Sequence, residues 1–266
     1  YAPWGDMEEE MRREGILLYG LESGDPIADF DIIGFSLGYE MAYTNVLNML
    51  DLAGLAIRSS QRKSLTPLVV AGGTCCYNPE PLTPFVDMFV LGEGEEVTLE
   101  YIHLYQQAKA EGWSKEEFLI EAAKIPGVYV PSFYRHEYNE DGTLKTIVSH
   151  NGAPEKITKR IIEDLDNAYF PTKMMVPSTE IVHDRANLEV FRGCIRGCRF
   201  CQAGFCYRPV RPRNADTLYR QAVESLENSG NHEITLSSLS TSDYRELKKL
   251  TDEMIPYCKE RRINLS

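Results

Sequence analysis

The chain has 266 residues, and its 43% hydrophobic and 26% charged content is ordinary for globular proteins, so wholesale disorder is excluded. Its formal net charge is −12, and residues 1–100 hold the whole excess of acids, which argues against nonspecific nucleic-acid binding through that half. No run approaches the ~18 apolar residues of a membrane helix, and the amino-terminal residues lack the basic charge and apolar stretch of a secretion signal. We therefore expect a cytoplasmic protein without a membrane segment.

The first half of the chain alternates strands with helices. Helical spacing of apolar residues occurs at residues 43–53 and 95–110. This alternation is typical of a doubly wound parallel sheet, so we predict an α/β, Rossmann-like domain over residues 1–125. Ligands of such sheets bind beyond the carboxyl ends of the strands. Glycines lie at those ends, because the buried strands are predicted by apolar runs that each stop at a glycine: residues 31–37, 67–71 and 85–91.

Residues 126–185 have a different pattern. Two alternating runs on either side of Asn139–Gly142 predict a β-hairpin, and the proline-rich remainder predicts an extended connector. A second alternation then begins, and we predict an incomplete βαβαβ domain over residues 186–266. Its strands and helices are expected, in turn, at residues 186–191, 215–229, 233–238, 243–262 and 263–266.

Seven cysteines in a chain without a secretion signal favour thiol chemistry or metal binding over disulfides. Cys194, Cys198 and Cys201 directly follow a predicted strand with the spacing CxxxCxxC, so a loop can aim the three thiolates at one point. Thiolates favour iron–sulfur clusters, zinc or cuprous ion. A structural zinc would need Cys206 as its fourth ligand. A 4Fe-4S cluster would instead leave one iron open, and reduced structural cysteines without a ligand are the third alternative.

The segment FRGCIRGCRFCQA (residues 191–203) resembles the signature of the radical S-adenosylmethionine (SAM) enzymes, CxxxCx(aromatic)C, with Phe200 at the aromatic position. The resemblance implies that Cys194, Cys198 and Cys201 bind three irons of a 4Fe-4S cluster, and that SAM binds the fourth. Reduction by one electron then cleaves SAM to methionine and a 5′-deoxyadenosyl radical, which takes a hydrogen atom from a substrate. It further implies that residues 186–266 begin a TIM-type barrel, and that an electron donor of flavodoxin or ferredoxin type is a partner.

The loop after residues 233–238 corresponds to a part of such barrels that often holds SAM. Serine hydroxyls there can form hydrogen bonds to SAM, whereas the alternative is that Ser242 or Asp243 caps the following helix. To SAM binding we assign Phe200, Ser237, Ser238 and Ser240.

Arginines gather around the cysteines, with no acid between residues 191 and 213. They can stabilise the anionic cluster, the SAM carboxylate or a phosphate-bearing substrate, or they can form a solvated loop. The six are Arg192, Arg196, Arg199, Arg208, Arg211 and Arg213.

The order of strands, helices and glycines in residues 1–125 resembles the cobalamin-binding domain that precedes many radical SAM barrels. The whole chain is similar to the uncharacterised cobalamin (B12)-binding-type radical SAM proteins. The DxHxxG motif that supplies a cobalt-ligating histidine in methyltransferase-type domains is not found, so cobalamin would bind without a histidine ligand. The alternative is a fold kept as a platform for a substrate or partner. The resemblance places along the corrin Ser36, Gly72, Gly73, Gly92, Glu93 and Gly94.

The sequence therefore predicts a radical SAM enzyme that binds a 4Fe-4S cluster and SAM, with cobalamin as a further cofactor. Complete domains of both kinds have more strands than these, so we expect the chain to be a fragment, incomplete at both ends. No catalytic side chain beyond the cluster ligands is assigned, and the substrate is not identified. Two alternatives stay open: a non-catalytic module with a structural zinc, and an RNA-modifying enzyme in which Arg208, Arg211 and Arg213 contact phosphates.

Overall fold

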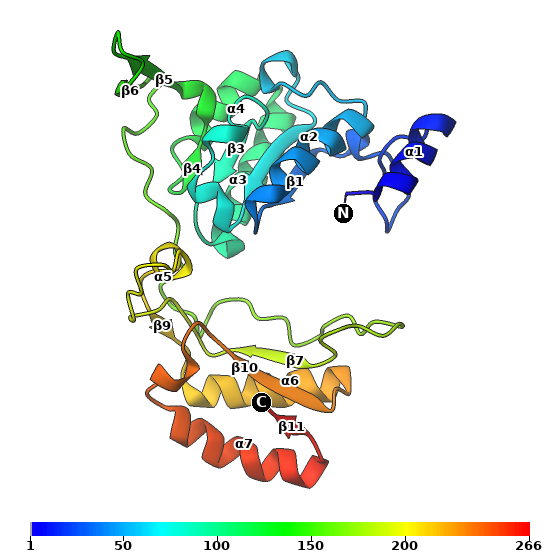
Figure 1. The fold of residues 1–266 in the computed structure, drawn as a ribbon, viewed down its shortest axis with the longest axis vertical. Coiled ribbons are helices and arrows are strands. Elements are labelled where there is room, and N and C mark those ends of the chain that lie inside the picture. The colour runs from blue at the N-terminus through cyan, green and yellow to red at the C-terminus, as the bar shows by residue number, and fades with distance from the viewer. Residues whose placement is uncertain (1) are drawn as a thin grey trace. The chain divides into compact units, whose positions relative to one another are not determined.

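The structure, a computed structural model, describes residues 2–266. The chain divides into two compact units, of which the first ends at Ile161 and the second begins at Ile162 (Figure 1). No helix among the described residues is both long enough and apolar enough to cross a membrane.

The first unit is built on a four-stranded sheet with helices on both faces. The strand order is β1-β2-β3-β4, in which β1, β2 and β3 are parallel and β4 runs antiparallel to β3. The strands are β1 (Ile32–Ser36), β2 (Leu68–Gly72), β3 (Met88–Val90) and β4 (Val128–Tyr129). The α-helices are α1 (Gly5–Glu14), α2 (Tyr43–Leu52), α3 (Gly94–Glu111) and α4 (Lys115–Ala122). The predicted parallel sheet of alternating strands and helices is thus confirmed.

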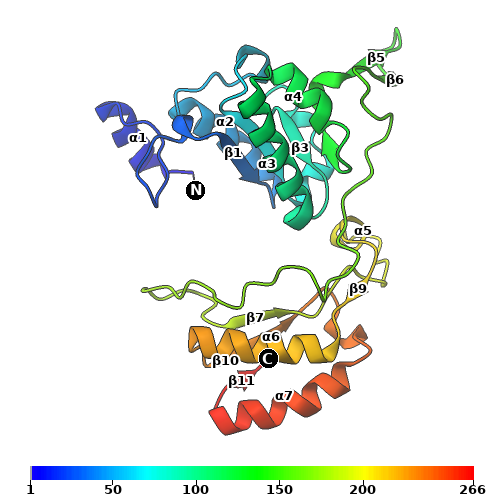
Figure 2. The same cartoon turned by 180° about the vertical axis from the view of Figure 1, so that it is seen from behind.

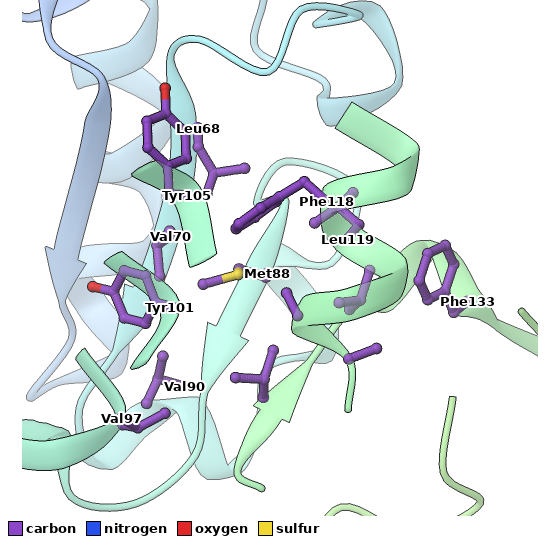
Figure 3. Packing of buried hydrophobic residues seen from close by; sticks show 14 of the residues in the cluster. Leu68, Val70, Met88, Val90, Val97, Tyr101, Tyr105, Phe118, Leu119 and Phe133 are labelled. Carbon is purple, nitrogen blue, oxygen red and sulfur yellow. The ribbon is translucent and has the colours of Figure 1, made fainter. Parts of the chain in front are cut away.

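Alternate residues of the buried strands face opposite layers, as a sheet covered on both faces requires. Leu68 and Val70 of β2 pack in one cluster with side chains of α3 and α4 (Figure 3). Val69 and Ala71 of the same strand pack in another cluster with α2. The helices therefore hold the central strands from both sides, which fixes the carboxyl ends of β1, β2 and β3 at one edge.

Helix α4 was not expected from the apolar pattern. Its start is set by a capping box, because Ser114 Oγ accepts from the Glu117 backbone N–H and the Glu117 carboxylate accepts from Ser114 N at 2.7 Å. The motif SxxE at residues 114–117 is the sequence signal for such a helix start. Phe118 and Leu119 then bury the helix against the cluster of Figure 3.

Residues 126–161, expected within a connector, lie in the first unit. Strand β4 completes the sheet, and β5 (Tyr134–Tyr138) and β6 (Leu144–Ser149) form the predicted hairpin around Asn139–Gly142. Both views show this hairpin projecting from the helices and sheet of that unit (Figure 2).

The second unit has a three-stranded parallel sheet in the order β11-β10-β7. Its strands are β7 (Ala186–Glu189), β10 (Glu233–Ser237) and β11 (Asn264–Leu265), and a separate antiparallel pair is formed by β8 (Phe191–Arg192) and β9 (Arg211–Pro212). The α-helices are α5 (Ala203–Cys206), α6 (Ala215–Ser229) and α7 (Leu247–Arg261). One apolar core joins the strands to α6 and α7, as expected for successive βα units.

Short 3-10 helices occupy several connections of the two units. They are η1 (Ile27–Asp29), η2 (Glu40–Ala42), η3 (Ser59–Gln61), η4 (Thr74–Tyr77), η5 (Glu80–Leu82), η6 (Pro131–Phe133) and η7 (Thr241–Asp243). The last of these corrects one sequence expectation, because the final helix begins at Leu247 and not at Asp243.

Candidate functional site

The three signature cysteines lie on the loop between β8 and β9. The antiparallel pairing of Phe191 with Pro212 and of Arg192 with Arg211 closes the base of this loop. Gly193 begins it with a φ of +87°, and an added Cβ would lie 2.6 Å from the Pro209 carbonyl oxygen. A glycine is therefore required where the chain leaves β8.

Hydrogen bonds within the loop involve all three signature cysteines, two through the backbone and one through its thiol. The backbone N–H of Cys201 donates to the carbonyl of Cys198 at 3.0 Å, and the N–H of Arg196 donates to Cys194 Sγ at 3.4 Å. Among residues 2–266, no three His, Cys, Asp or Glu side chains are gathered closely enough to hold a metal. The donor chemistry nonetheless fits an iron–sulfur cluster, and metal sites commonly close only around their metal.

Cys206, the residue that a zinc site would need, lies at the end of α5 and is buried. Cys198 is exposed, and Cys194 and Cys201 are half-buried. The four thiols therefore lie in different environments, and no four-cysteine cage is present among the described residues.

A cavity of about 450 Å³ adjoins the first signature cysteine. Cys194 and Ile195 line it from the loop between β8 and β9, residues 193–210, which we call the cluster loop. Ser240 and Asp243 line it from the loop after β10. Enzymes with a βα-barrel fold bind their ligands at the carboxyl ends of the barrel strands. Remaining wall residues are Phe191, Val210, Pro212, Arg213, Asn214, Tyr244, Arg245 and Glu246.

An ion pair links the two loops beside this cavity. Arg196, between the first two cysteines, donates through Nε to Asp243 Oδ2 at 2.7 Å and through Nη2 to Asp243 Oδ1. Ser240 Oγ also donates to Asp243 Oδ2, at 2.8 Å. These hydrogen bonds hold the pKa of Asp243 below its ordinary value, and the hydrogen bond from Arg196 has the largest effect. Sequence reasoning missed this pair because its members are 47 positions apart.

The residues assigned to SAM binding have different surroundings. Ser240 lines the cavity, whereas Ser238 shares a hydrogen bond of 2.8 Å with Thr241 Oγ1. Ser237 is the last residue of β10, and Phe200 is 92% exposed and is not part of the cavity wall. The alternative role of helix cap is wrong for both Ser242 and Asp243, since they lie in η7 and α7 has Glu246 as its N-cap residue.

Five of the six clustered arginines have partners within the chain, so less of the segment's positive charge is exposed than expected; one of the five, Arg208, lies 4.5 Å from the centre of the Phe205 ring. Arg192 forms a hydrogen bond of 2.7 Å with Glu189 at the end of β7, and Arg196 pairs with Asp243. Arg211 and Arg213 are buried, and their guanidinium groups donate to the carbonyls of Ile162 and Leu165. The expectation that Arg211 and Arg213 contact phosphates is therefore wrong, because neither is accessible. Arg199 and Arg208 are exposed.

Glu189 joins two of these arginines. It accepts from Arg192 and from Arg213 Nη2, the latter at 3.2 Å. Burial favours the neutral carboxyl, but the hydrogen bonds and charges of the two arginines outweigh burial and lower the pKa of Glu189. This acid was missed in the sequence analysis, although its spacing of three residues from Arg192 was a readable signal.

At the carboxyl edge of the first sheet, two of the six residues assigned to cobalamin are glycines with no room for a side chain. Gly92 has a φ of +111°, and an added Cβ would lie 2.1 Å from the carbonyl oxygen of Arg160, which forms a parallel bridge with it. At Gly73, an added Cβ would lie 2.6 Å from the Leu37 carbonyl oxygen. These two glycines are therefore required by packing within the first unit.

The other four residues at that edge are Ser36, Gly72, Glu93 and Gly94. Ser36 and Gly94 are exposed, and Gly72 and Glu93 are half-buried. This edge is therefore only partly closed by the chain.

Comparisons with known proteins cover part of the first unit in one case and most of the chain in the others. Residues 1–131 match a family described as radical SAM proteins, N-terminal. An uncharacterized protein of Methanocaldococcus jannaschii, MJ0966, is 32% identical over 244 residues, which cover 89% of this chain and 45% of that protein. The chain thus spans about half the length of this relative.

Two solved structures of the radical SAM methyltransferase TsrM from Kitasatospora setae share the fold of this chain. Both are 15% identical to it, with TM-scores of 0.50 and 0.51, and cover 98% of this chain and 46% of TsrM. One structure contains the tryptophan substrate and a SAM analogue, and the other contains cobalamin and a [4Fe-4S] cluster. The match of residues 1–131 supports the predicted radical SAM family, and the likeness to TsrM shows that the chain shares the fold of that enzyme.

Proposed function

We propose that the second unit carries the cofactor site of a radical SAM enzyme, in which Cys194, Cys198 and Cys201 bind three irons of a 4Fe-4S cluster. The observation that carries the proposal is the position of these thiols. They follow an edge strand on one glycine-started loop, and Cys194 lines a cavity of about 450 Å³. Cavities of roughly 300–1,000 Å³ accommodate small-molecule cofactors.

The chain's own contribution is to position SAM beside the cluster loop. When bound, the cluster supplies the electron that cleaves SAM into methionine and a 5′-deoxyadenosyl radical. Apolar side chains of Ile195, Val210 and Tyr244 line the cavity and would exclude water from the radical. Ser240 offers a hydroxyl on the opposite loop.

Arg245 is the cation that we assign to the SAM carboxylate. It lines the same cavity, is exposed, and has no ion-pair partner among the described residues. Arg196, by contrast, is neutralised by Asp243, and Arg213 is buried against Glu189. Arg245 was missed in the sequence analysis because it lies outside the arginine-rich segment.

Cobalamin is the proposed cofactor of the first unit, and the TsrM structure that contains cobalamin supports this assignment. Its fit depends on Ser36, Gly72 and Gly94, because Gly73 and Gly92 are packed against the chain itself and the Glu93 backbone N–H donates to the Arg160 carbonyl at 3.0 Å. Cobalt would have no histidine ligand from this edge. A corrin absorbance spectrum that stays with the protein through gel filtration would support cobalamin, and a colourless protein would favour the platform alternative.

The deciding experiment measures iron, sulfide and zinc in the full-length protein after anaerobic reconstitution. About four irons and four sulfides per chain, with a reduced-cluster paramagnetic resonance spectrum that changes when SAM is added, are expected. Zinc at one per chain, or a cluster whose spectrum ignores SAM, would overturn the proposal in favour of a structural module. An electron donor of flavodoxin or ferredoxin type is part of the proposal, and the exposed loop leaves the cluster within its reach.

A further inference from the structure

A second cavity, of about 470 Å³, lies in the first unit at the amino ends of β2 and β3. This is the opposite edge of the sheet from the glycines assigned to cobalamin. Its apolar wall includes Leu119 and Phe133, both labelled in Figure 3. Its polar wall includes Ser59, Ser60, Arg62, Lys63, Asp87 and Lys115.

Three charged side chains form a buried cluster in that wall. Asp87, whose side chain is 1% exposed, accepts from Arg62 Nη2 at 3.1 Å and from Lys115 Nζ at 2.7 Å. Its other oxygen accepts from the Val69 backbone N–H at 2.9 Å. Both carboxylate oxygens thus accept hydrogen bonds, and the single negative charge neutralises only one of its two cationic partners.

Donors remain in excess over acceptors in this cluster. Lys115 Nζ donates to Asp87 and to the Arg62 carbonyl, which leaves one of its three N–H groups without an acceptor. Arg62 donates through both Nη atoms, but its Nε is buried without a partner. A buried surplus of positive charge is costly unless an anion compensates it.

A third cation faces the same cavity. Lys63 is exposed and has no ion-pair partner among the described residues, and the one further acid of the wall, Glu116, is exposed at the rim. Burial lowers the pKa of Lys115, and the charges of Arg62 and Lys63 add to this effect against the opposing Asp87. The wall therefore carries a positive surplus within an acidic unit.

We propose that this cavity binds the phosphate group of a small molecule. Lys63, Ser59 and Ser60 line the cavity from residues 59–63 and Lys115 lines it from the start of α4, so donors on two segments are available to a tetrahedral group with three acceptor oxygens. The apolar wall would contact the rest of the molecule. This proposal does not depend on the cluster or SAM.

Inorganic phosphate is the probe, and urea unfolding of the full-length protein followed by tryptophan fluorescence is the measurement. Both tryptophans of this chain, Trp4 and Trp113, belong to the first unit. Phosphate should raise the unfolding midpoint relative to chloride at equal ionic strength, because a ligand of the folded state stabilises it. Acetate tests a carboxylate in place of phosphate.

Lys63→Gln removes a cation of the wall without touching the buried cluster, and Lys145→Gln, an exposed lysine of β6, is the matched control. We expect phosphate affinity to fall about tenfold in Lys63→Gln and to stay unchanged in Lys145→Gln. Lys115→Gln should lose the phosphate effect while Arg62 still pairs with Asp87. Equal effects of phosphate, acetate and chloride, or equal phosphate affinity in Lys63→Gln and Lys145→Gln, would overturn the proposal.

Discussion

The strand ends of the two units show opposite uses of the same kind of position. In the first unit, the backbone of Arg160 closes against Gly92, and the Arg160 side chain adds ion pairs to Glu96 and Glu100 of α3. In the second unit, the chain leaves β8 and exposes Ile195, Phe200 and a thiol of Cys198. The chain itself therefore covers part of the first strand-end edge, whereas at the second a reactive thiol is exposed to solvent.

This difference shows how strongly a glycine at a strand end and a cysteine on a loop each indicate a functional site. A glycine at a strand end permits close approach by any backbone, and here the partner at Gly92 is the chain itself. Three thiols on an exposed loop have no comparable packing role, because buried surroundings are what inert cysteines usually occupy. The cysteine spacing is therefore the stronger functional signal of the two.

The largest effect is expected at the signature cysteines. Replacing Cys194, Cys198 or Cys201 by alanine should abolish cluster binding, because each would supply an iron ligand. Cys206→Ala is the matched control, since Cys206 is buried in α5 and lies outside the proposed ligand set. Iron and sulfide analysis of the four reconstituted variants would test this, and loss of the cluster in Cys206→Ala would contradict the three-ligand site.

At the closed edge, Gly92→Ala should destabilise the first unit by about 3 kcal/mol or more, because its Cβ would meet the Arg160 backbone. Gly112→Ala is the control. Gly112 also has a positive φ, of +71°, but nothing lies within 4 Å of an added Cβ, so about 1 kcal/mol is expected. Urea unfolding followed by tryptophan fluorescence measures both variants. Equal losses would mean that Arg160 does not close this edge.

The sequence predicted the elements whose signals are local. Apolar runs predicted β1, β2 and β3, and the second strand–helix alternation predicted β10. The spacing of Cys194, Cys198 and Cys201 indicated the family whose amino-terminal model matches residues 1–131. The contacts between distant segments could not be predicted in this way. Arg160 against Gly92 and Arg196 against Asp243 depend on how loops return to a sheet edge, which no local pattern encodes.

The arginine-rich segment shows the same limit. Composition alone indicated a cationic surface, but burial of Arg211 and Arg213 is decided by packing against residues 162–165. How much of this positive charge is exposed could therefore be learned only from the structure.

A smaller effect is expected from breaking the Arg196–Asp243 ion pair, which links the cluster loop to the loop after β10. Arg196→Ala should loosen the cluster loop, because it removes the bidentate ion pair to Asp243, and amide hydrogen exchange across residues 194–201 should become faster. Arg220→Ala, at an exposed arginine of α6, is the control and should leave that exchange unchanged. Unaltered loop exchange in Arg196→Ala would show that the ion pair does not restrain the loop.

The smallest effect concerns acid stability of the second unit. Glu189 has a lowered pKa in the folded state, because Arg192 and Arg213 outweigh its burial. Its stabilising contribution is therefore complete above the unfolded value of about 4.3 and is lost as the pH falls through the lower folded value. Glu189→Gln should remove this dependence, so the wild type should lose more stability than the variant below about pH 4. Hydrogen exchange of β7 between pH 6 and pH 3, corrected for intrinsic rates, would test this. Parallel pH profiles in the two proteins would show that the positions of Arg192 and Arg213 do not depend on the ionised Glu189 carboxylate. The pairing of β8 with β9 at the base of the cluster loop would then be stabilised by packing alone.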